Sequence, residues 1–255
     1  MLWYKAWLET RWRFVIGLVV LMFSACGTVL AYPRVMELLS SAPTIDASGA
    51  IGRQIREGVE LARDYRGYVW SQWFRENLIQ MWTLFAVLLG SGSVLSQASG
   101  GGTLFTLSLP ASRNRLVGVR VATGLWELLV LALVPSLLIP LFSPAVGQSY
   151  SVGSVLVFGG CLFVAGTAFF SLALLLSSVF SDLWRPLLLA CGLAFGLSIA
   201  GQLSPDISRY SIFRVMNGEA YFRGNGLPWL GLFASTALSA AMLYATTRNI
   251  AHQDF

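Results

Sequence analysis

Charge is scarce in this sequence, and so are the residues that most catalytic sites need. Only 11% of the 255 residues are charged, whereas soluble domains carry about a quarter. The single histidine, His252, stands near the C-terminus, so no serine and histidine pair is available inside an apolar segment. Glu127 is the only acid within such a segment, which excludes paired carboxylates. A catalytic site within the apolar segments is therefore not expected.

Cysteine and lysine are also rare. Cys26, Cys161 and Cys191 lie in apolar stretches without the Cys and His spacing of a zinc site, and we interpret them as small buried hydrophobic residues. Lys5 is the only lysine, and no Gly-rich phosphate loop ending in Lys followed by Ser or Thr is present. The chain itself is expected to hold no cofactor and no metal, and not to be an enzyme.

What the sequence has in excess is apolar residues, at 56% of the chain. Crossing a bilayer takes about 20 mostly apolar residues of helix, and the cost of unpaired backbone in lipid restricts spanning segments to helices and closed barrels. The apolar runs are too long for barrel strands. The prediction is an all-α, polytopic membrane protein, one domain over residues 1–255, with six spans at 14–32, 78–95, 121–142, 155–180, 187–200 and 227–246.

The distribution of basic residues predicts the orientation. Lys and Arg mark cytoplasmic loops, and they occur in the N-terminal flank and in the loop between the second and third spans, as Lys5, Arg11, Arg13, Arg113, Arg115 and Arg120. The loop 143–153 has no charge. We expect both termini in the cytoplasm of a bacterial or archaeal cell, with the chain in its plasma membrane. The net charge of +5 is accounted for in this way and does not indicate nucleic acid.

Three segments outside the spans have their own patterns. Residues 1–13 place apolar and Trp residues at helical spacing, which indicates either an interfacial helix or a flank that begins the first span. Residues 33–76 predict an external segment with an amphipathic helix, in which Tyr65, Tyr68, Trp70 and Trp73 are interpreted as an interfacial aromatic belt. Residues 201–226 are rich in apolar side chains and predict an external loop or a re-entrant segment.

The predicted cytoplasmic loop 96–120 combines a Gly run, several apolar side chains and Arg residues. Gly100, Gly101 and Gly102 allow a sharp exit from the second span, and Pro110 suits the start of a helix. From the residues alone, a projection that docks on a soluble partner and an ordinary connecting loop are equally compatible with this pattern.

The same loop resembles a known family. "GGTLFTLSLPASRNRLVGVR" is similar to a signature of permease subunits of ATP-binding-cassette (ABC) transporters of the type 2 exporter class, and the matching residues are Gly102, Thr103, Leu104, Leu107, Leu109, Pro110, Ser112 and Arg113. Arg115 follows in the same segment, and the C-terminal "TTRNIAHQDF" resembles the family's ending. Where family members usually carry an acid before Gly-Thr-Leu, this chain has Ser99 to Gly101.

This resemblance implies a function and partners. The loop would be a coupling helix seated on a separate ABC ATPase, which binds the ATP and Mg. Two permease subunits would pair as a homodimer or heterodimer among membrane lipids, and the segment 201–226 would form re-entrant helices. The expected function is the membrane subunit of an ATP-driven exporter working by alternating access. The alternative is a non-transporting membrane anchor or assembly subunit.

Two groups inside the spans complete the candidate residues. Arg120, Thr123 and Glu127 share one helix face, and because an ionised side chain in lipid usually faces protein or water, they indicate either a functional polar contact or an interhelical hydrogen bond. Gly192, Gly196 and Ala200 recur every four residues, which lets helices approach closely. They predict packing within the chain or a dimer seam, and the family resemblance favours the seam.

Overall fold

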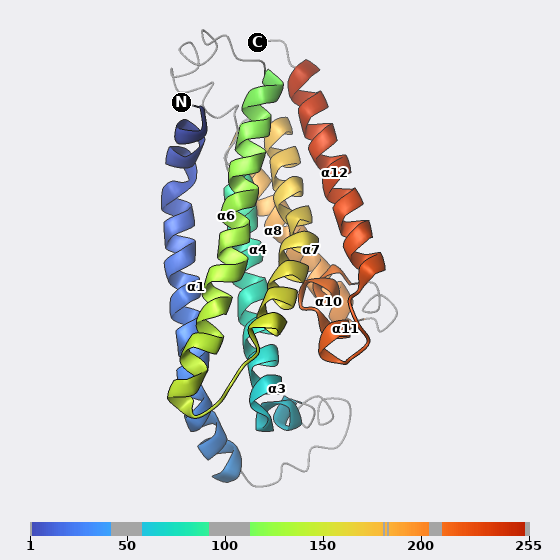
Figure 1. Ribbon diagram of the computed structural model, residues 1–255. Helices are drawn as coiled ribbons and strands as arrows, with labels where there is room; N and C mark the ends of the chain where they lie inside the picture. Colours follow the sequence, from blue (N-terminus) through green and yellow to red (C-terminus); the bar gives the residue numbers. More distant parts are fainter. Residues whose placement is uncertain are drawn as a thin grey trace.

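The computed structural model describes residues 2–41, 58–91, 113–180, 182, 184–203 and 211–252. Within these residues the protein is helical and contains no strand. The helices form an elongated bundle in which α7 (Val152–Val179) is central (Figure 1). It contacts α4, α6, α8, α10 and α12, and 67% of its most apolar window is buried, against 17% for α8 and for α12.

The other long helices surround α7. On one side α1 (Leu2–Ser41) packs along α6 (Arg113–Phe142), and α4 (Leu78–Gly90) contacts both of them and α7. On the other side lie α8 (Trp184–Leu203) and α12 (Trp229–His252). A short 3-10 helix, η3 (Ser143–Val146), follows α6.

Five of the described helices are long and apolar enough to cross a membrane. They are Trp3–Leu39, Val117–Val146, Val152–Val179, Trp184–Gly201 and Trp229–Ala251, and they include five of the six predicted spans to within two residues. The remaining predicted span, 78–95, corresponds to α4, which has only 13 residues. It continues directly from α3 (Tyr65–Val69) and the π-helix η1 (Trp70–Asn77), so the helix is longer than its apolar part.

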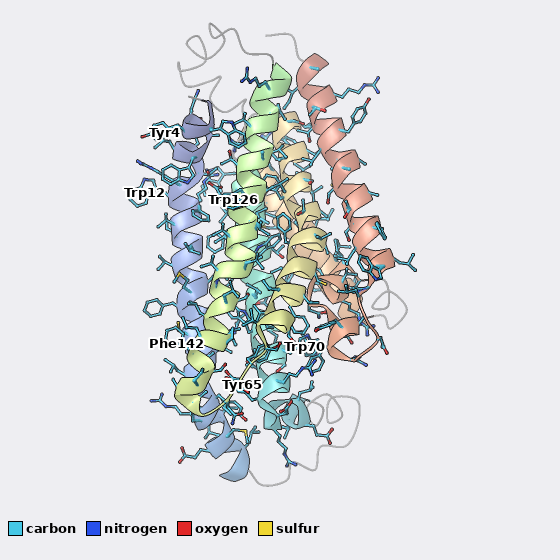
Figure 2. The ribbon with its side chains drawn as sticks, viewed as in Figure 1. Tyr4, Trp12, Tyr65, Trp70, Trp126 and Phe142 are labelled. Atoms are coloured by element: carbon cyan, nitrogen blue, oxygen red, sulfur yellow. The ribbon has the colours of Figure 1, made fainter. Side chains whose placement is uncertain are left out.

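Helix α1 differs from the predicted division of the N-terminal region. The structure shows no break between residues 2–13 and the first span, and α1 passes through Pro33 to Ser41. The predicted interfacial segment is thus the start of the first long helix. Trp3, Tyr4 and Trp12 are exposed on it, and Trp126 of α6 is exposed near the same end (Figure 2), as in an aromatic belt.

The aromatic residues of the predicted external helix are buried, and their assignment to an interfacial belt was wrong. Their side chains lie inside the bundle, with exposures of 4% or less, because each polar tip finds a partner on another element. The bonds are Tyr65 Oη with Ser143 Oγ (2.7 Å), Tyr68 Oη to Thr28 O (3.1 Å), Trp70 Nε1 to Asn217 O (3.0 Å) and Trp73 Nε1 to Ser136 Oγ (3.2 Å).

Two short helices precede α12, within the predicted external or re-entrant segment. They are α10 (Ile212–Met216) and α11 (Glu219–Phe222), and α10 packs against α7 and α12. The Phe222 ring stacks on Trp70 at 4.1 Å between centroids. Gly218 between the two helices has φ +62°, and a Cβ there would lie 2.8 Å from the Phe158 ring, so glycine is required. The segment therefore folds back onto the bundle.

Both termini lie at one end of the bundle (Figure 1). The end of α4 and the start of α6 lie there too, since Arg13 contacts Leu88 and Glu9 contacts Arg120. Residues 92–112, which connect them, are outside the described part of the chain. The described residues on both sides of the predicted coupling segment thus lie at the end that carries the termini.

Close packing of α7 against α4 yields the first prediction. A Cβ at Gly166 would lie 2.2 Å from the Trp82 ring, which is fully buried and fixed by its hydrogen bond to Leu128 O (3.0 Å). We expect Gly166→Ala to destabilise the protein by about 1 to 3 kcal/mol through overpacking. Thermal unfolding in detergent measures the change.

Gly160→Ala is the matched control on the same helix. A Cβ at Gly160 meets nothing within 4 Å, so this variant should be neutral or gain up to about 1 kcal/mol from helix propensity. Equal unfolding temperatures for the two variants would contradict the packing described here.

Candidate functional site

A buried polar cluster joins α1 to α6. Glu127 of α6 is 1% exposed, and its Oε1 accepts a hydrogen bond from Thr10 Oγ1 at 2.5 Å. Two turns earlier, Arg120 Nη1 pairs with Glu9 Oε2 at 3.2 Å. The two neighbouring residues Glu9 and Thr10 of α1 therefore hold Arg120 and Glu127 of α6. Thr123 does not bridge them, because its hydroxyl donates to Val119 O of its own helix.

The cluster extends to α4 through Arg13. Its Nη1 donates to the carbonyl of Leu88 at 2.8 Å, and Leu88 lies in the last turn of α4, where carbonyl groups lack helical partners and favour cations. Arg13 and Arg120 thus connect α1 with both helices that flank residues 92–112. Arg120 and Glu127, grouped on one helix face in the sequence, each contact a residue of α1, and the α1 residues Glu9, Thr10 and Arg13 were not predicted.

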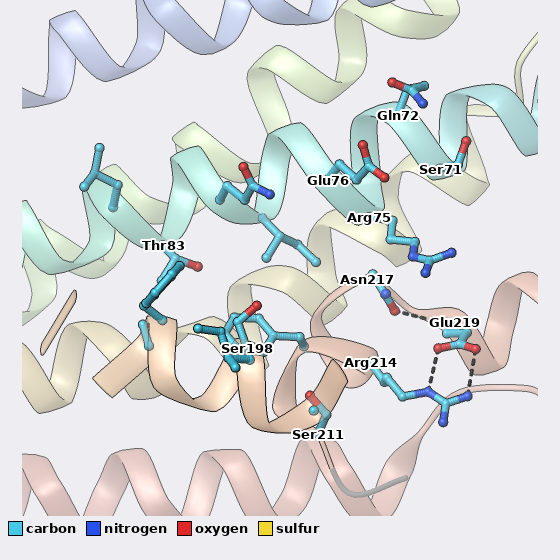
Figure 3. A pocket seen from close by; sticks show the side chains of 18 of the residues that line it. Ser71, Gln72, Arg75, Glu76, Thr83, Ser198, Ser211, Arg214, Asn217 and Glu219 are labelled. Atoms are coloured by element: carbon cyan, nitrogen blue, oxygen red, sulfur yellow. Dashed lines mark hydrogen bonds and ion pairs between the residues drawn. The ribbon is translucent and has the colours of Figure 1, made fainter. Parts of the chain in front are cut away.

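A groove runs between the η1–α4 helix and α8, and α10 and α11 close one end (Figure 3). Its volume is about 1520 Å³, above the range of about 300 to 1,000 Å³ for drug-sized ligands. The wall formed by η1 and α4 carries a stripe of polar side chains: Ser71, Gln72, Arg75, Glu76, Gln80 and Thr83. The opposite wall, from α8, is mostly apolar.

The charged end of the groove is built around Glu219. Its carboxylate accepts two hydrogen bonds from Arg214, from Nε at 2.6 Å and Nη2 at 2.7 Å, and pairs with Arg223 Nη2 at 2.6 Å. Burial disfavours the ionised form, but the hydrogen bonds and charges of Arg214, and the charges of Arg223 and Arg75, outweigh it and lower the pKa of Glu219. Glu219 is therefore ionised at neutral pH.

Arg75 faces this cluster from the other wall (Figure 3). Its guanidinium lies 5.8 Å from the Trp70 ring centroid and makes no ion pair within the described residues. Asn217 holds the loop in place, since its Oδ1 accepts from Glu219 N at 2.9 Å and its carbonyl accepts from Trp70. Three arginines and one carboxylate thus meet at this end of the groove, with Glu76 nearby.

The other half of the groove is apolar except for a few hydroxyl and amide groups. Leu84, Val87, Cys191, Phe195 and Ile199 line it. Thr83 is 7% exposed, and its hydroxyl has no hydrogen-bond partner within the described residues.

The remaining predicted residues fall in three places. Arg113 and Arg115 begin α6, and Arg115 is exposed. On α8, Gly192 and Gly196 are exposed, and a Cβ at either would meet nothing within 4 Å, whereas Ala190 and Ala194 form the buried strip. Ala200 is half-buried. The other coupling residues lie outside the described residues, namely Gly102, Thr103, Leu104, Leu107, Leu109, Pro110 and Ser112.

The groove was not predicted from the sequence, although the periodic polar residues that line one of its walls can be recognised there. Gln72, Glu76, Gln80 and Thr83 recur at intervals of four, four and three residues, which places them on one helix face. The predicted second span began at Leu78, after the charged residues, and this boundary divided the stripe between two segments. A search for polar periodicity across that boundary would have found it.

Comparisons with known proteins give no match to a family model, a curated protein or a solved structure. Among the described residues, no group of three or more His, Cys, Asp and Glu side chains is arranged to hold a metal ion. The function must therefore be argued from the cluster, the groove and the sequence.

The contact between Thr10 and Glu127 yields the second prediction. Thr10→Val and Glu127→Leu should each destabilise the protein, and the double variant should cost less than their sum by about 0.6 to 2 kcal/mol, the range for interhelical hydrogen bonds in membranes. Unfolding in detergent of the wild type, both single variants and the double variant gives this coupling energy.

Thr28→Val supplies the control for this cycle. Thr28 is also a buried residue of α1, but its hydroxyl donates to Ser24 O of the same helix. Its combination with Glu127→Leu should be additive. Additivity for Thr10 and Glu127 as well would show that their hydrogen bond contributes nothing to stability.

Proposed function

We propose that this protein is the membrane-spanning permease subunit of an ATP-driven ABC exporter. The observation that carries the proposal is the resemblance of residues 102–113 to the permease signature. The structure supports the proposal through the position of the residues that flank this segment. The end of α4 and the start of α6, which residues 92–112 connect, both contact α1. The helix from α3 to α4 is the second of six spans in this proposal.

The polar cluster suits the transmission of motion from this segment. Arg13 holds the last turn of α4, and Glu9 and Thr10 hold the first turns of α6. A displacement of residues 92–112 by a partner would act on both helices and, through these contacts, on α1. A separate ATPase, with its own ATP and Mg, would supply that displacement from the cytoplasm.

A second permease subunit completes the proposed transporter. A Cβ at Gly192 or Gly196 on α8 would meet nothing within 4 Å among the described residues, so a helix of another subunit has room to approach this exposed strip closely. In this arrangement α10 and α11 would be the re-entrant helices of the outer side. The partner is either another copy of this chain or a related one.

The groove favours transport over the alternative of a non-transporting anchor. Charged and amide side chains on a spanning helix are costly in lipid and generally face water, protein or a ligand. A subunit that only anchors other proteins needs no such stripe. A permease needs one for passage of its cargo.

The third prediction concerns coupling. Leu107→Ala or Arg113→Gln should leave the permease and ATPase associated, yet abolish most stimulation of ATP hydrolysis by the permease, because the contact that transmits force is lost. The ATPase that co-purifies from native membranes is assayed alone and with each variant in proteoliposomes.

Leu230→Ala and Arg34→Gln are the controls for this experiment. Leu230 is 89% exposed in the first turn of α12, and Arg34 is an exposed charge in the last third of α1, both outside the coupling segment. Both should retain wild-type stimulation. Full stimulation by the Leu107 and Arg113 variants would count against the coupling role.

The fourth prediction concerns orientation. After replacement of Cys26, Cys161 and Cys191 by Ala, a membrane-impermeant thiol reagent added to intact cells should label Gln148→Cys and not Ser112→Cys, because Gln148 is exposed at the opposite end. Inverted vesicles should give the reverse pattern. Labelling of Ser112→Cys from outside intact cells would overturn the proposed topology.

A further inference from the structure

The groove between the η1–α4 helix and α8 has the chemistry of a ligand site. Its polarity changes along its length: the end near α10 and α11 contains Arg75, Glu76, Arg214, Glu219 and Arg223, whereas the stretch from Leu84 to Val87 opposite Cys191 and Phe195 contains no charge. A ligand that fills the groove must therefore be amphiphilic, with its charged group at the arginine end.

The charges at that end favour an anion. Glu219 already satisfies Arg214 and Arg223, since both of its oxygens accept from their guanidinium groups. Arg75 is exposed to the groove and makes no ion pair within the described residues. A phosphate would add a partner for Arg75 and for donors of Arg214 and Arg223 that do not contact Glu219, in the planar geometry that guanidinium groups favour.

An independent observation points to a ligand in the apolar half. Thr83 lines the groove and is more than nine-tenths buried, and its hydroxyl has no hydrogen-bond partner within the described residues. A buried hydroxyl without a hydrogen bond is costly, and a plain hydrocarbon chain would leave it unpaired. The ligand should therefore carry a hydrogen-bond acceptor, such as the carbonyl of an acyl linkage, beyond its head group.

We propose that this groove binds an acylated amphiphile with a phosphate head group of net negative charge, the head at Arg75 and the acyl part along α4 and α8. Under the function proposed above it would be the cargo site, and that assignment rests on the proposed function. Binding itself does not, because it needs neither the ATPase nor transport.

The native thiol of Cys191 gives a reporter inside the groove. In the purified full chain with Cys26→Ala and Cys161→Ala, the labelling rate of Cys191 is measured in detergent micelles with added phosphatidylglycerol, phosphatidylcholine or glycerol phosphate. Phosphatidylglycerol should slow labelling at the lowest concentration. Glycerol phosphate supplies the head group without the acyl chains, so it should protect weakly or not at all.

Arg75→Gln should weaken the protection by phosphatidylglycerol about tenfold or more, as expected for loss of a charge-assisted hydrogen bond. Arg34→Gln removes the same charge from an exposed site outside the groove lining and should have no effect. Thr83→Val should weaken protection by phosphatidylglycerol without changing the behaviour of glycerol phosphate.

Three results would overturn the proposal. Equal protection by phosphatidylglycerol and phosphatidylcholine would exclude anion recognition, and equal protection by glycerol phosphate would show a head-group site only. If Cys191 is protected from labelling without added lipid and the purified protein has the mass of a dimer, a second copy of the chain covers the groove. If any of these three results is obtained while the permease still stimulates ATP hydrolysis normally, the ligand site is refuted but the proposed exporter function is not.

Discussion

The structure depends on one constraint: in a bilayer, each polar group needs a partner within the protein. Water is absent from the hydrocarbon core, so unpaired donors and acceptors cost several kcal/mol. Serine and threonine hydroxyls accordingly donate to carbonyls of their own helices, as Ser136, Thr167 and Ser171 do. Ring tips of Trp73 and Trp82 bond across helices instead. These cross-helix bonds fix which helices are neighbours.

Close contact supplies the rest of the packing, because lipid is as apolar as the helix surfaces and gives no hydrophobic drive between them. Glycines bring backbones and rings together at several crossings. A Cβ at Gly90 would lie 2.8 Å from the Phe170 carbonyl, and one at Gly124 would lie 2.5 Å from the Phe170 ring. Phe170 of α7 therefore packs between α4 and α6, which explains why α7 is the central helix.

The sequence predicted the long apolar helices well, because length and hydropathy are sufficient to identify them. It predicted the aromatic segment poorly, because a Trp or Tyr that suits an interface also suits a core with a carbonyl within reach. Tyr68 and Trp70 found such carbonyls at Thr28 and Asn217, which lie 40 and 147 residues away along the chain. Glu127 could be recognised as needing a partner, but its partner Thr10 lies on another helix, 117 residues away.

The continuous helix from Tyr65 to Gly90 connects the polar cluster with the groove. Arg75 in its π-helical part faces the groove, and Leu88 in its last turn accepts from Arg13. These positions are 13 residues apart, or about 20 Å along a helix. A movement of the Leu88 end of the helix therefore changes the groove unless the helix deforms between Arg75 and Leu88.

Deformation is easiest where the hydrogen bonding already departs from the α-helical pattern. At the junction of η1 and α4, Leu78 N donates to Trp73 O, five residues back. The stripe of polar residues passes through this junction. The π-helical segment that carries Gln72, Arg75 and Glu76 therefore also determines how far a displacement of the end of α4 moves the wall of the groove.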